Sequence, residues 1–325
     1  MKHMTTRIAA LTLALGFVFA PFAVQAEEAL PVGAAVEDDR LVVYVDGEEF
    51  TAYKFGEEHK YPFFYPVNGP ATGESVTAWD QEPYPHHSSL YISLDWVRSE
   101  GVERGNYWQP RHELETGQVF SRNPRIIEAT GGRVVLQDEC DWIVPEHDAH
   151  QLRDVRTVTI TAPSPNIRLL DFQFDFEVLK DLQVGPTGHS FFSARMRPEL
   201  APGDEERGPE QAPLGTGTLV DSEGNVDEEE ARGHTGASWS AMSGQHHGET
   251  EGLAIVQHAG NPLYPAPWFN RNYGFMSPTP FHFMDDPLPL SEGLTFTVRY
   301  RTIVFTGDPE EADVAGWAAR FQAGE

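Results

Sequence analysis

Short stretches in which apolar and polar residues alternate recur along the chain, and this pattern restricts the fold more than any other feature. In the stretch 171–177, Phe172, Phe174 and Phe176 fall on one face of an extended chain, and acidic and amide side chains fall on the other. Residues 156–161 alternate in the same way. Such stretches are typical of β-strands that bury one face in a core.

Turn-forming residues separate these stretches. The chain contains 25 prolines and 29 glycines, and they are spread throughout its length. The apolar run 41–45 ends in Asp46-Gly47, a dipeptide that favours a two-residue hairpin turn. A longer strand is expected over 294–305. Many short strands joined by turns predict an all-β fold, specifically an antiparallel β-sandwich.

One segment near the C-terminus has the pattern of a helix. Asp308 suits the N-cap position and Pro309 the first helical position. Val314, Trp317 and Phe321 then recur at helical spacing and would form an apolar stripe against the sheets. The sequence therefore predicts one short C-terminal helix in an otherwise all-β protein.

Residues 1–26 have the three-part pattern of a signal peptide. A basic start is followed by the apolar run 8–19 and by small residues that end at Ala26, after which cleavage is expected. The apolar run is shorter than the ~20 residues that a membrane-spanning helix needs. The pattern predicts export to the periplasm or the medium, without stable membrane insertion.

The rest of the chain, 27–325, is expected to form a single β-sandwich domain, because it shows no internal repeat and no change of composition. Residues at about 201–232 are acidic and rich in glycine and proline, and we expect them to form a long surface loop. Cys140 is the sole cysteine, so an intramolecular disulfide is excluded. Its apolar neighbours predict that it is buried.

The chain is strongly acidic. Its formal net charge is −27, and cleavage after Ala26 would remove Lys2 and Arg7, giving −29. Such a surface repels phosphate backbones, which excludes nucleic acid as a partner. We interpret the charge as a solubilising surface.

Three histidines are candidates for proton transfer, since imidazole is suited to this task near neutral pH. His86 and His87 are adjacent, so their rings should point in different directions, and His258 opens the turn-rich segment 258–273. The alternative is that these histidines make structural hydrogen bonds. We expect the His86–His87 segment and the 258–273 segment to line one cleft, with Arg195 nearby.

Further candidates would bind the substrate. Aromatic rings can stack on a sugar, and arginine can hold a carboxylate or carbonyl oxygen. Instead of binding the substrate, a tryptophan could be buried in the core, and an arginine could form a structural salt bridge. The substrate-binding candidates are Trp108, Arg111, His189, Arg195, Asn261, Trp268, Arg271 and Tyr273.

Thirteen histidines, including the pair His246–His247, leave a metal site open, since imidazole suits Zn, Cu, Fe and Ni. No histidine pair has a recognised ligand spacing. The sequence therefore requires no cofactor, and a divalent metal stays as an alternative.

Several of these segments, taken in order, resemble the PmoA-like family, exported bacterial proteins that are often labelled methane oxygenase PmoA. The chain departs from the family pattern at Ser88-Ser89 and at 186–189. The resemblance implies a β-sandwich of the galactose-mutarotase-like supersandwich type, in bacteria that degrade polysaccharides. The segments that carry it include 65–70, 85–90, 252–255, 258–262, 271–274 and 293–301.

Three functions follow as hypotheses. The first is a carbohydrate-processing enzyme, a hydrolase, lyase or epimerase, whose ligand is a carbohydrate or another small polar molecule. The second is a non-catalytic glycan-binding or envelope protein. The third, suggested by the family label, is a metal-dependent oxidoreductase.

Overall fold

The computed structural model describes residues 28–109, 115–203, 215–233, 236–281 and 284–325. The predicted signal peptide, Arg111 and the central part of the predicted acidic loop lie outside these residues. Export and the single-domain assignment stay predictions. In the described ranges, no helix is both long and apolar enough to cross a membrane.

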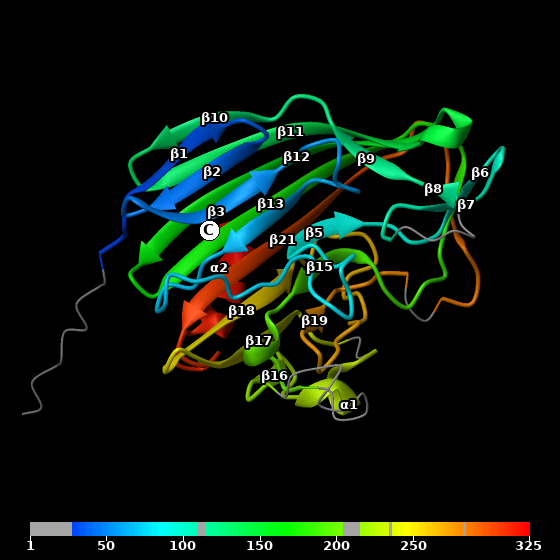
Figure 1. Ribbon diagram of the computed structural model, residues 1–325. Helices are drawn as coiled ribbons and strands as arrows, with labels where there is room; N and C mark the ends of the chain where they lie inside the picture. The colour runs from blue at the N-terminus through cyan, green and yellow to red at the C-terminus, as the bar shows by residue number, and fades with distance from the viewer. Residues whose placement is uncertain (1–27, 110–114, 204–214, 234–235, 282–283) are drawn as a thin grey trace, which may run out of the picture.

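Two large antiparallel sheets pack face to face and form a sandwich (Figure 1). Seven strands make the first sheet, in the spatial order β1-β2-β3-β4-β5-β15-β19. Its strands are β1 (Val32–Glu37), β2 (Arg40–Val45), β3 (Glu48–Lys54), β4 (Phe63–Val67), β5 (Leu90–Ser93), β15 (Phe191–Arg195) and β19 (Phe275–Met276).

Nine strands make the second sheet, in the order β10-β11-β12-β13-β21-β18-β17-β16, with β9 paired to β11. Its strands are β9 (Gln118–Ser121), β10 (Arg125–Thr130), β11 (Arg133–Val144), β12 (Ala149–Ser164), β13 (Ile167–Val178), β16 (Thr218–Asp221), β17 (Trp239–His246), β18 (Glu249–Gln257) and β21 (Thr295–Thr306).

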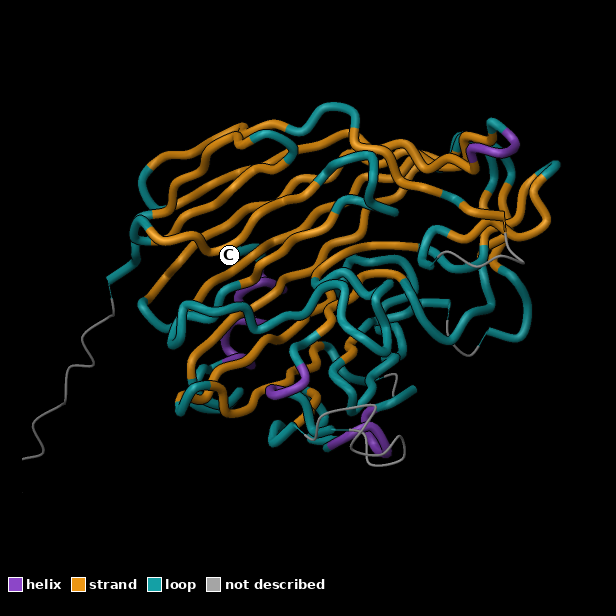
Figure 2. The backbone as a smooth tube through the Cα atoms, in the orientation of Figure 1, coloured by secondary structure: helices purple, strands orange, loops and turns teal. Residues whose placement is uncertain are grey.

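A third, small sheet lies at one end of the sandwich, with β7 and β8 parallel and the other pairs antiparallel. Helices are few, and strands make up most of the regular backbone (Figure 2). The strands are β6 (Val97–Ser99), β7 (Val102–Asn106), β8 (Glu115–Thr116), β14 (Leu182–Val184) and β20 (Leu288–Leu290), and the helices are α1 (Asp227–Ala231), α2 (Val314–Ala323) and the 3₁₀ turns Pro145–His147 and Pro198–Leu200.

The main core lies between the two large sheets. Phe172, Phe174 and Phe176 on β13 are buried, as their alternation predicts. The ring of Phe172 contacts Phe64 and Phe192 of the opposite sheet, at centroid distances of 5.5 and 4.9 Å. The predicted antiparallel β-sandwich is confirmed, and hydrophobic burial between the sheets is its main source of stability.

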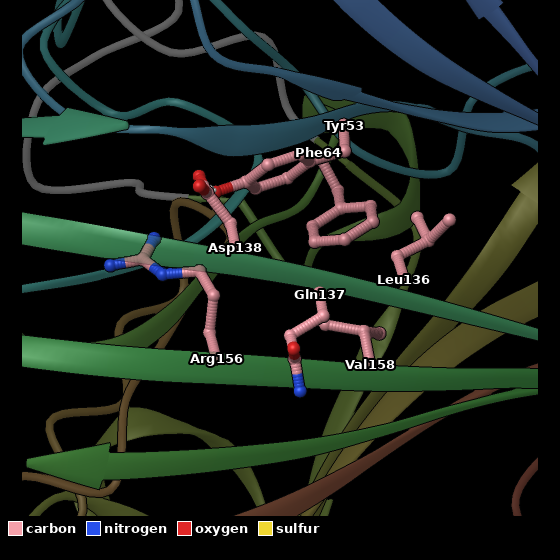
Figure 3. Close-up of a pocket in the computed structure, with 7 residues that line it drawn as sticks. All are labelled: Tyr53, Phe64, Leu136, Gln137, Asp138, Arg156 and Val158. Atoms are coloured by element: carbon pink, nitrogen blue, oxygen red, sulfur yellow. Dashed lines mark hydrogen bonds between the residues drawn. The ribbon is translucent and has the colours of Figure 1, made fainter. Parts of the chain in front are cut away.

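A small cavity lies between the two large sheets, among residues of β3, β4, β11 and β12. It has a volume of about 10 Å³ and lies beside Tyr53, Phe64, Asp138 and Arg156 (Figure 3). That volume is about the minimum that holds one water molecule. A sugar cannot enter there. Cys140, close to this cavity, is buried as predicted.

The C-terminal helix is confirmed, but it begins later than the sequence predicts. Helix α2 starts at Val314, and Asp313 caps it by accepting a hydrogen bond from the backbone N–H of Gly316. Asp308 instead accepts the N–H groups of Glu310 and Glu311 and closes a separate turn. Asp313 has a φ of 51°, so the chain leaves the helical conformation between these two caps. Val314, Ala318 and Phe321 of α2 pack on the outer face of the second sheet.

The segment at about 201–232 is not a surface loop throughout, which corrects the prediction. Thr218–Asp221 forms the edge strand β16, and Asp227–Ala231 forms helix α1. Leu219 and Ala231 are fully buried and anchor these elements to the core. The acidic composition concealed these two apolar anchors.

Candidate functional site

Strand pairing in the first sheet brings distant segments together. Strands β5, β15 and β19 are neighbours, with Ala194 opposite Leu90 and Arg195 opposite Phe275 (Figure 1). The segment 84–87 precedes β5, His189 precedes β15 and Tyr273 precedes β19. Their side chains therefore gather at one place, which we call the His87 cluster. Its members are Tyr84, His86, His87, Trp108, His189, Arg195 and Tyr273.

His87 lies at the centre of the cluster and is 1% exposed. Its ring stacks on Tyr84 at 5.1 Å and contacts Phe275 at 4.5 Å and Tyr273 at 6.2 Å. Its Nδ1 has no hydrogen-bond partner among the described residues. Burial, reinforced by the positive charges of its neighbours, lowers the pKa of His87 well below its usual value. His87 is therefore neutral at pH 7.

Arg195 is a buried cation. Its guanidinium lies over the rings of Tyr273 and Tyr84, at 5.1 and 5.7 Å, and donates a hydrogen bond to the backbone carbonyl of Tyr273. No carboxylate of the described residues pairs with it, and its Nε has no acceptor there. Burial lowers the pKa of Arg195 to about 10. The group thus stays charged at neutral pH, and the two tyrosine rings offset only part of the cost of burying it, because no carboxylate of the described residues pairs with it.

His189 is held by a carboxylate. Its Nδ1 lies 3.2 Å from Oδ2 of Asp95, which is buried and also accepts a hydrogen bond from Asn106. The imidazole stacks on Trp108 at 3.9 Å. Trp108 is itself buried and donates to the hydroxyl of Tyr91. This Asp–His pair fixes the ring and, in its neutral form, directs Nδ1–H to the carboxylate.

A second arginine borders the cluster. Arg271 lies over the ring of Tyr273 at 5.1 Å, and its Nε is 2.6 Å from Oε1 of Glu228 on α1. Arg271 is therefore neutralised within the protein, which Arg195 is not. Of the two arginines, Arg195 is therefore the one that could pair with an anionic group of a ligand.

Not every predicted residue joins the cluster. The side chain of Asn261 bonds to the backbone of Arg299 through both its oxygen and its nitrogen. His258 contacts Phe321 of α2 at 5.2 Å, and its Nδ1 accepts the N–H of Gly260. Trp268 is fully buried and donates to the carbonyl of Ala237. The expectation that His258 shares a cleft with His86 and His87 is thus not met.

The reason is the path of the chain after β18. Residues 257–261 stay attached to β21 and α2 through Asn261 and through Gln322, which bonds to the backbone of Gln257 and Ala259. The chain reaches the His87 cluster at Phe269, whose ring lies 5.8 Å from that of His189, and continues along it through Arg271 and Tyr273. Tyr273 lies beside His87 in the cluster with Trp108, His189 and Arg195, and Arg271 borders it over the ring of Tyr273. Arg111 lies outside the described residues.

Sequence reasoning missed Asp95 and Glu228. A single acidic residue that ends the apolar run 90–94 is the signal that could have identified Asp95. Glu228 had no such signal, because it lies among many acidic residues.

The low pKa of His87 predicts a pH dependence of stability. The unfolded chain binds a proton at this residue near pH 6.5, whereas the native state does not, so stability is full above that pH and falls below it. The free energy of unfolding should decrease by up to about 1.4 kcal/mol per pH unit for this group. Urea unfolding at pH 7.5, 6.5 and 5.5 measures the slope.

His87→Phe should flatten this slope, whatever it does to stability at pH 7.5. His258→Ala is the matched control, because His258 is only half-buried and its pKa is less strongly lowered by burial. An unchanged slope in His87→Phe would contradict the buried neutral imidazole.

Comparison of the sequence with models of known protein families shows the family to which this chain belongs. A family model described as "Family of unknown function (DUF6807)" matches residues 40–319, most of the chain. The chain belongs to this family. The resemblance to the PmoA-like family is therefore wrong, because no PmoA family model matches. Short Pro-, Gly- and His-rich turns occur in the loops of many β-sandwiches, so their order did not discriminate between families. The oxidoreductase hypothesis, which rested on that label, loses its support.

Solved structures match this DUF6807 chain with low overlap. A putative aldose 1-epimerase from Escherichia coli K12 is 9% identical with a TM-score of 0.36, covering 86% of this chain and 99% of that one. A galactose mutarotase related enzyme from Lactobacillus acidophilus is 10% identical with a TM-score of 0.33, covering 85% and 97%. A polysaccharide lyase is 11% identical with a TM-score of 0.32, and the match covers 86% of this chain and 33% of the lyase. Overlap this low transfers no activity. No significant match was found among curated proteins.

Proposed function

We propose that this DUF6807 protein is a carbohydrate-processing enzyme whose His87 cluster binds a sugar that carries a carboxylate. The observation that carries the proposal is Arg195, a buried guanidinium with no carboxylate partner among the described residues. Breaking or omitting the partner of a buried charge is costly. A ligand carboxylate would supply the missing partner and regain part of that cost as binding energy.

The other members of the cluster suit a sugar ligand. Tyr84 and His86 remain partly exposed: the ring of Tyr84 lies over Arg195, and that of His86 packs edge-on against Tyr84 and Trp108. Trp108 is less suited to be the sugar platform that the sequence suggested, because it is buried and His189 is stacked on it. The recognition groups that remain partly exposed are thus Tyr84, His86 and His189, and Arg195 lies buried beneath Tyr84.

The available chemistry favours proton abstraction over hydrolysis. Glycoside hydrolysis commonly uses two carboxyl groups. The two carboxylates described here, Asp95 and Glu228, are engaged by His189 and Arg271. What remains is imidazole and guanidinium. His189, oriented by Asp95, would take the proton from the carbon next to the sugar carboxylate, and Arg195 would stabilise the charge that develops on that carboxylate.

This chemistry corresponds to a lyase or an epimerase. In a lyase the abstraction is followed by loss of the oxygen at the β-carbon, which leaves a double bond. In an epimerase a proton returns to the opposite face of the same carbon. The neutral His87 and the neighbouring His86 would serve as the second proton-transfer group.

A matched panel of oligosaccharides tests the proposal. Each neutral sugar is paired with its uronic-acid counterpart, and binding is measured by calorimetry. Formation of a double bond is followed by ultraviolet absorbance and epimerisation by NMR. We expect the protein to bind acidic members and to discriminate against neutral ones, because only the former supply a partner for Arg195.

His189→Ala should abolish turnover while binding is largely retained, and His258→Ala should change neither. Binding without turnover in the wild-type protein would favour the non-catalytic glycan-binding function. Equal affinity for neutral and acidic members would contradict the role of Arg195.

A further inference from the structure

A second group of chemistry-bearing side chains lies away from the His87 cluster, where the β17–β18 hairpin meets the loop that follows β4. His246 is the last residue of β17, and His247 forms the two-residue turn with Gly248. Both turn residues have positive φ, 51° and 87°, which is the geometry of a tight hairpin. Glu74 approaches this turn from the loop between β4 and β5.

The three side chains present their ligand atoms to one point. Nε2 of His246 lies 3.5 Å from Oε2 of Glu74, and Nε2 of His247 lies 3.3 Å from Oε1. The ligand atoms of all three residues lie within 4.8 Å of one another. In a tetrahedral zinc site with bonds of 2.0–2.1 Å, neighbouring ligand atoms are about 3.3 Å apart. The two distances from the histidine nitrogens to the Glu74 carboxylate are close to that value.

His246 is the observation that points to a cation. It is 6% exposed, and its Nε2 has no hydrogen-bond partner among the described residues. Its Nδ1 faces Oε1 of Glu251 at 3.4 Å. If Nδ1 carries the proton and donates it to Glu251, the lone pair of Nε2 points toward the carboxylate of Glu74. Two electron-rich atoms facing each other are repulsive unless a cation lies between them.

Glu251 is built to orient His246. It is fully buried and accepts hydrogen bonds from the hydroxyl and the backbone N–H of Thr72, at 2.6 and 3.3 Å. A Cβ on Gly69 would lie 2.0 Å from Oε2 of Glu251, so only glycine permits this close approach. A carboxylate that holds the far nitrogen of a histidine is the usual outer partner of a metal-binding imidazole.

We propose that Glu74, His246 and His247 bind a divalent transition metal such as Zn²⁺, with Glu251 as the orienting partner of His246. Two imidazoles and one carboxylate are a donor set that suits zinc, and three protein ligands leave a fourth position for water or a ligand. Glu74 also lines an open depression of about 480 Å³ together with Trp79 and Arg197. Arg197 contacts Glu74 at 3.4 Å and would steady its carboxylate.

The described residues contain one other such group, Asp39, Glu58 and His59. It has no buried histidine and no orienting carboxylate behind it, so it carries no proposal.

Metal titration of the purified full chain, freed of metal by chelation, tests the site. Zn²⁺ binding is measured by calorimetry, and Co²⁺ is used as a spectroscopic probe because its visible bands report tetrahedral coordination. We expect one equivalent to bind. Glu251→Gln should weaken binding roughly 10–100-fold, as loss of an orienting partner does. His246→Ala, His247→Ala and Glu74→Gln should each weaken it further.

His150→Ala is the matched control, since His150 on β12 is an exposed histidine that also lies near a carboxylate, that of Asp148 at 3.7 Å. It should leave the affinity unchanged. Circular dichroism shows whether each variant folds. Glu74→Gln and His247→Ala alter exposed side chains, so these two variants still test the site if His246→Ala unfolds. Equal affinity in the wild type and in the His247→Ala and Glu74→Gln variants, or loss of binding in His150→Ala, would overturn the proposal. If no stoichiometric metal binding is measured, the proposal is also overturned, and His246 is then a protonated imidazole that pairs with the carboxylates of Glu74 and Glu251.

Discussion

Replacing Asp154 by alanine is expected to lower the free energy of unfolding by about 3–5 kcal/mol, because it leaves a buried arginine without its partner. Asp154 and Arg156 lie on the same face of β12 and form a two-pronged ion pair, with N–O distances of 2.9 and 2.7 Å. Their side chains are 0% and 4% exposed. Asp154 also accepts a hydrogen bond from the indole of Trp142 at 2.7 Å.

In the Asp154→Ala variant, no neighbouring group is expected to replace Asp154 as the partner of Arg156. The carboxylate of Asp138 lies near Arg156 and accepts a hydrogen bond from the hydroxyl of Tyr53 at 2.8 Å (Figure 3). It also accepts one from the backbone N–H of Asn123. The cavity beside these groups holds one water at most. Arg156 would therefore stay charged in an apolar interior, facing the ring of Phe174.

Asp141→Ala is the matched control on the neighbouring strand β11. Asp141 pairs with Arg122 and Arg153, at 3.0 and 3.2 Å, but both arginines are well exposed. Exposed pairs contribute about 0–1 kcal/mol. Chemical denaturation of the two variants at pH 7.5 measures the difference. Losses that agree within about 1 kcal/mol would mean that Asp138 takes over as the partner of Arg156.

Replacing Arg195 by glutamine is expected to weaken binding of an acidic sugar roughly 10–100-fold. A hydrogen bond to a charged group contributes about 1.5–3 kcal/mol, and each 1.4 kcal/mol is a factor of ten in affinity. The affinity for the neutral counterpart should stay the same. Removing an unpaired buried charge relieves a desolvation cost, which partly offsets the lost ring contacts and the lost hydrogen bond to Tyr273. The loss of stability should therefore be smaller than for the arginine of a structural ion pair.

Arg299→Gln provides the control. Arg299 lies on β21 and donates to Gln173 at 2.9 Å, outside the His87 cluster. Its replacement should leave both affinities unchanged. If Arg195→Gln weakens the acidic and the neutral sugar equally, Arg195 shapes the site without binding the carboxylate. If it unfolds the protein, Arg195 is structural and the proposed function loses its main support.

The elements that were predicted correctly depend on local patterns. Alternation over 171–177 placed Phe172, Phe174 and Phe176 in the core, and Asp46-Gly47 does join β2 to β3 with positive φ at both residues. The start of α2 was placed too early because the chain offers two aspartates that can each cap a turn. Which of them begins a helix depends on the contacts of Val314 and Phe321 with the second sheet.

The candidate site depends on strand partners, which periodicity does not specify. Arg195 and Tyr273 lie beside His87 because β15 pairs with both β5 and β19. His258 has the same residue type and a similar turn-rich context, yet it is tied to β21 and α2. Nothing local to His258 distinguishes it from His87.

By itself, the sequence determined the fold class, the buried faces of the strands and the residue types from which a site could be built. These follow from the two-residue period of a strand and from turn chemistry, both of which act over a few residues. Only the tertiary structure decided that Asp95 holds His189, that Arg195 has no carboxylate among the described residues, and that Glu74 meets His246 and His247. Those are relations between segments far apart in the chain, and they are fixed by which strands pair and which apolar faces are buried together.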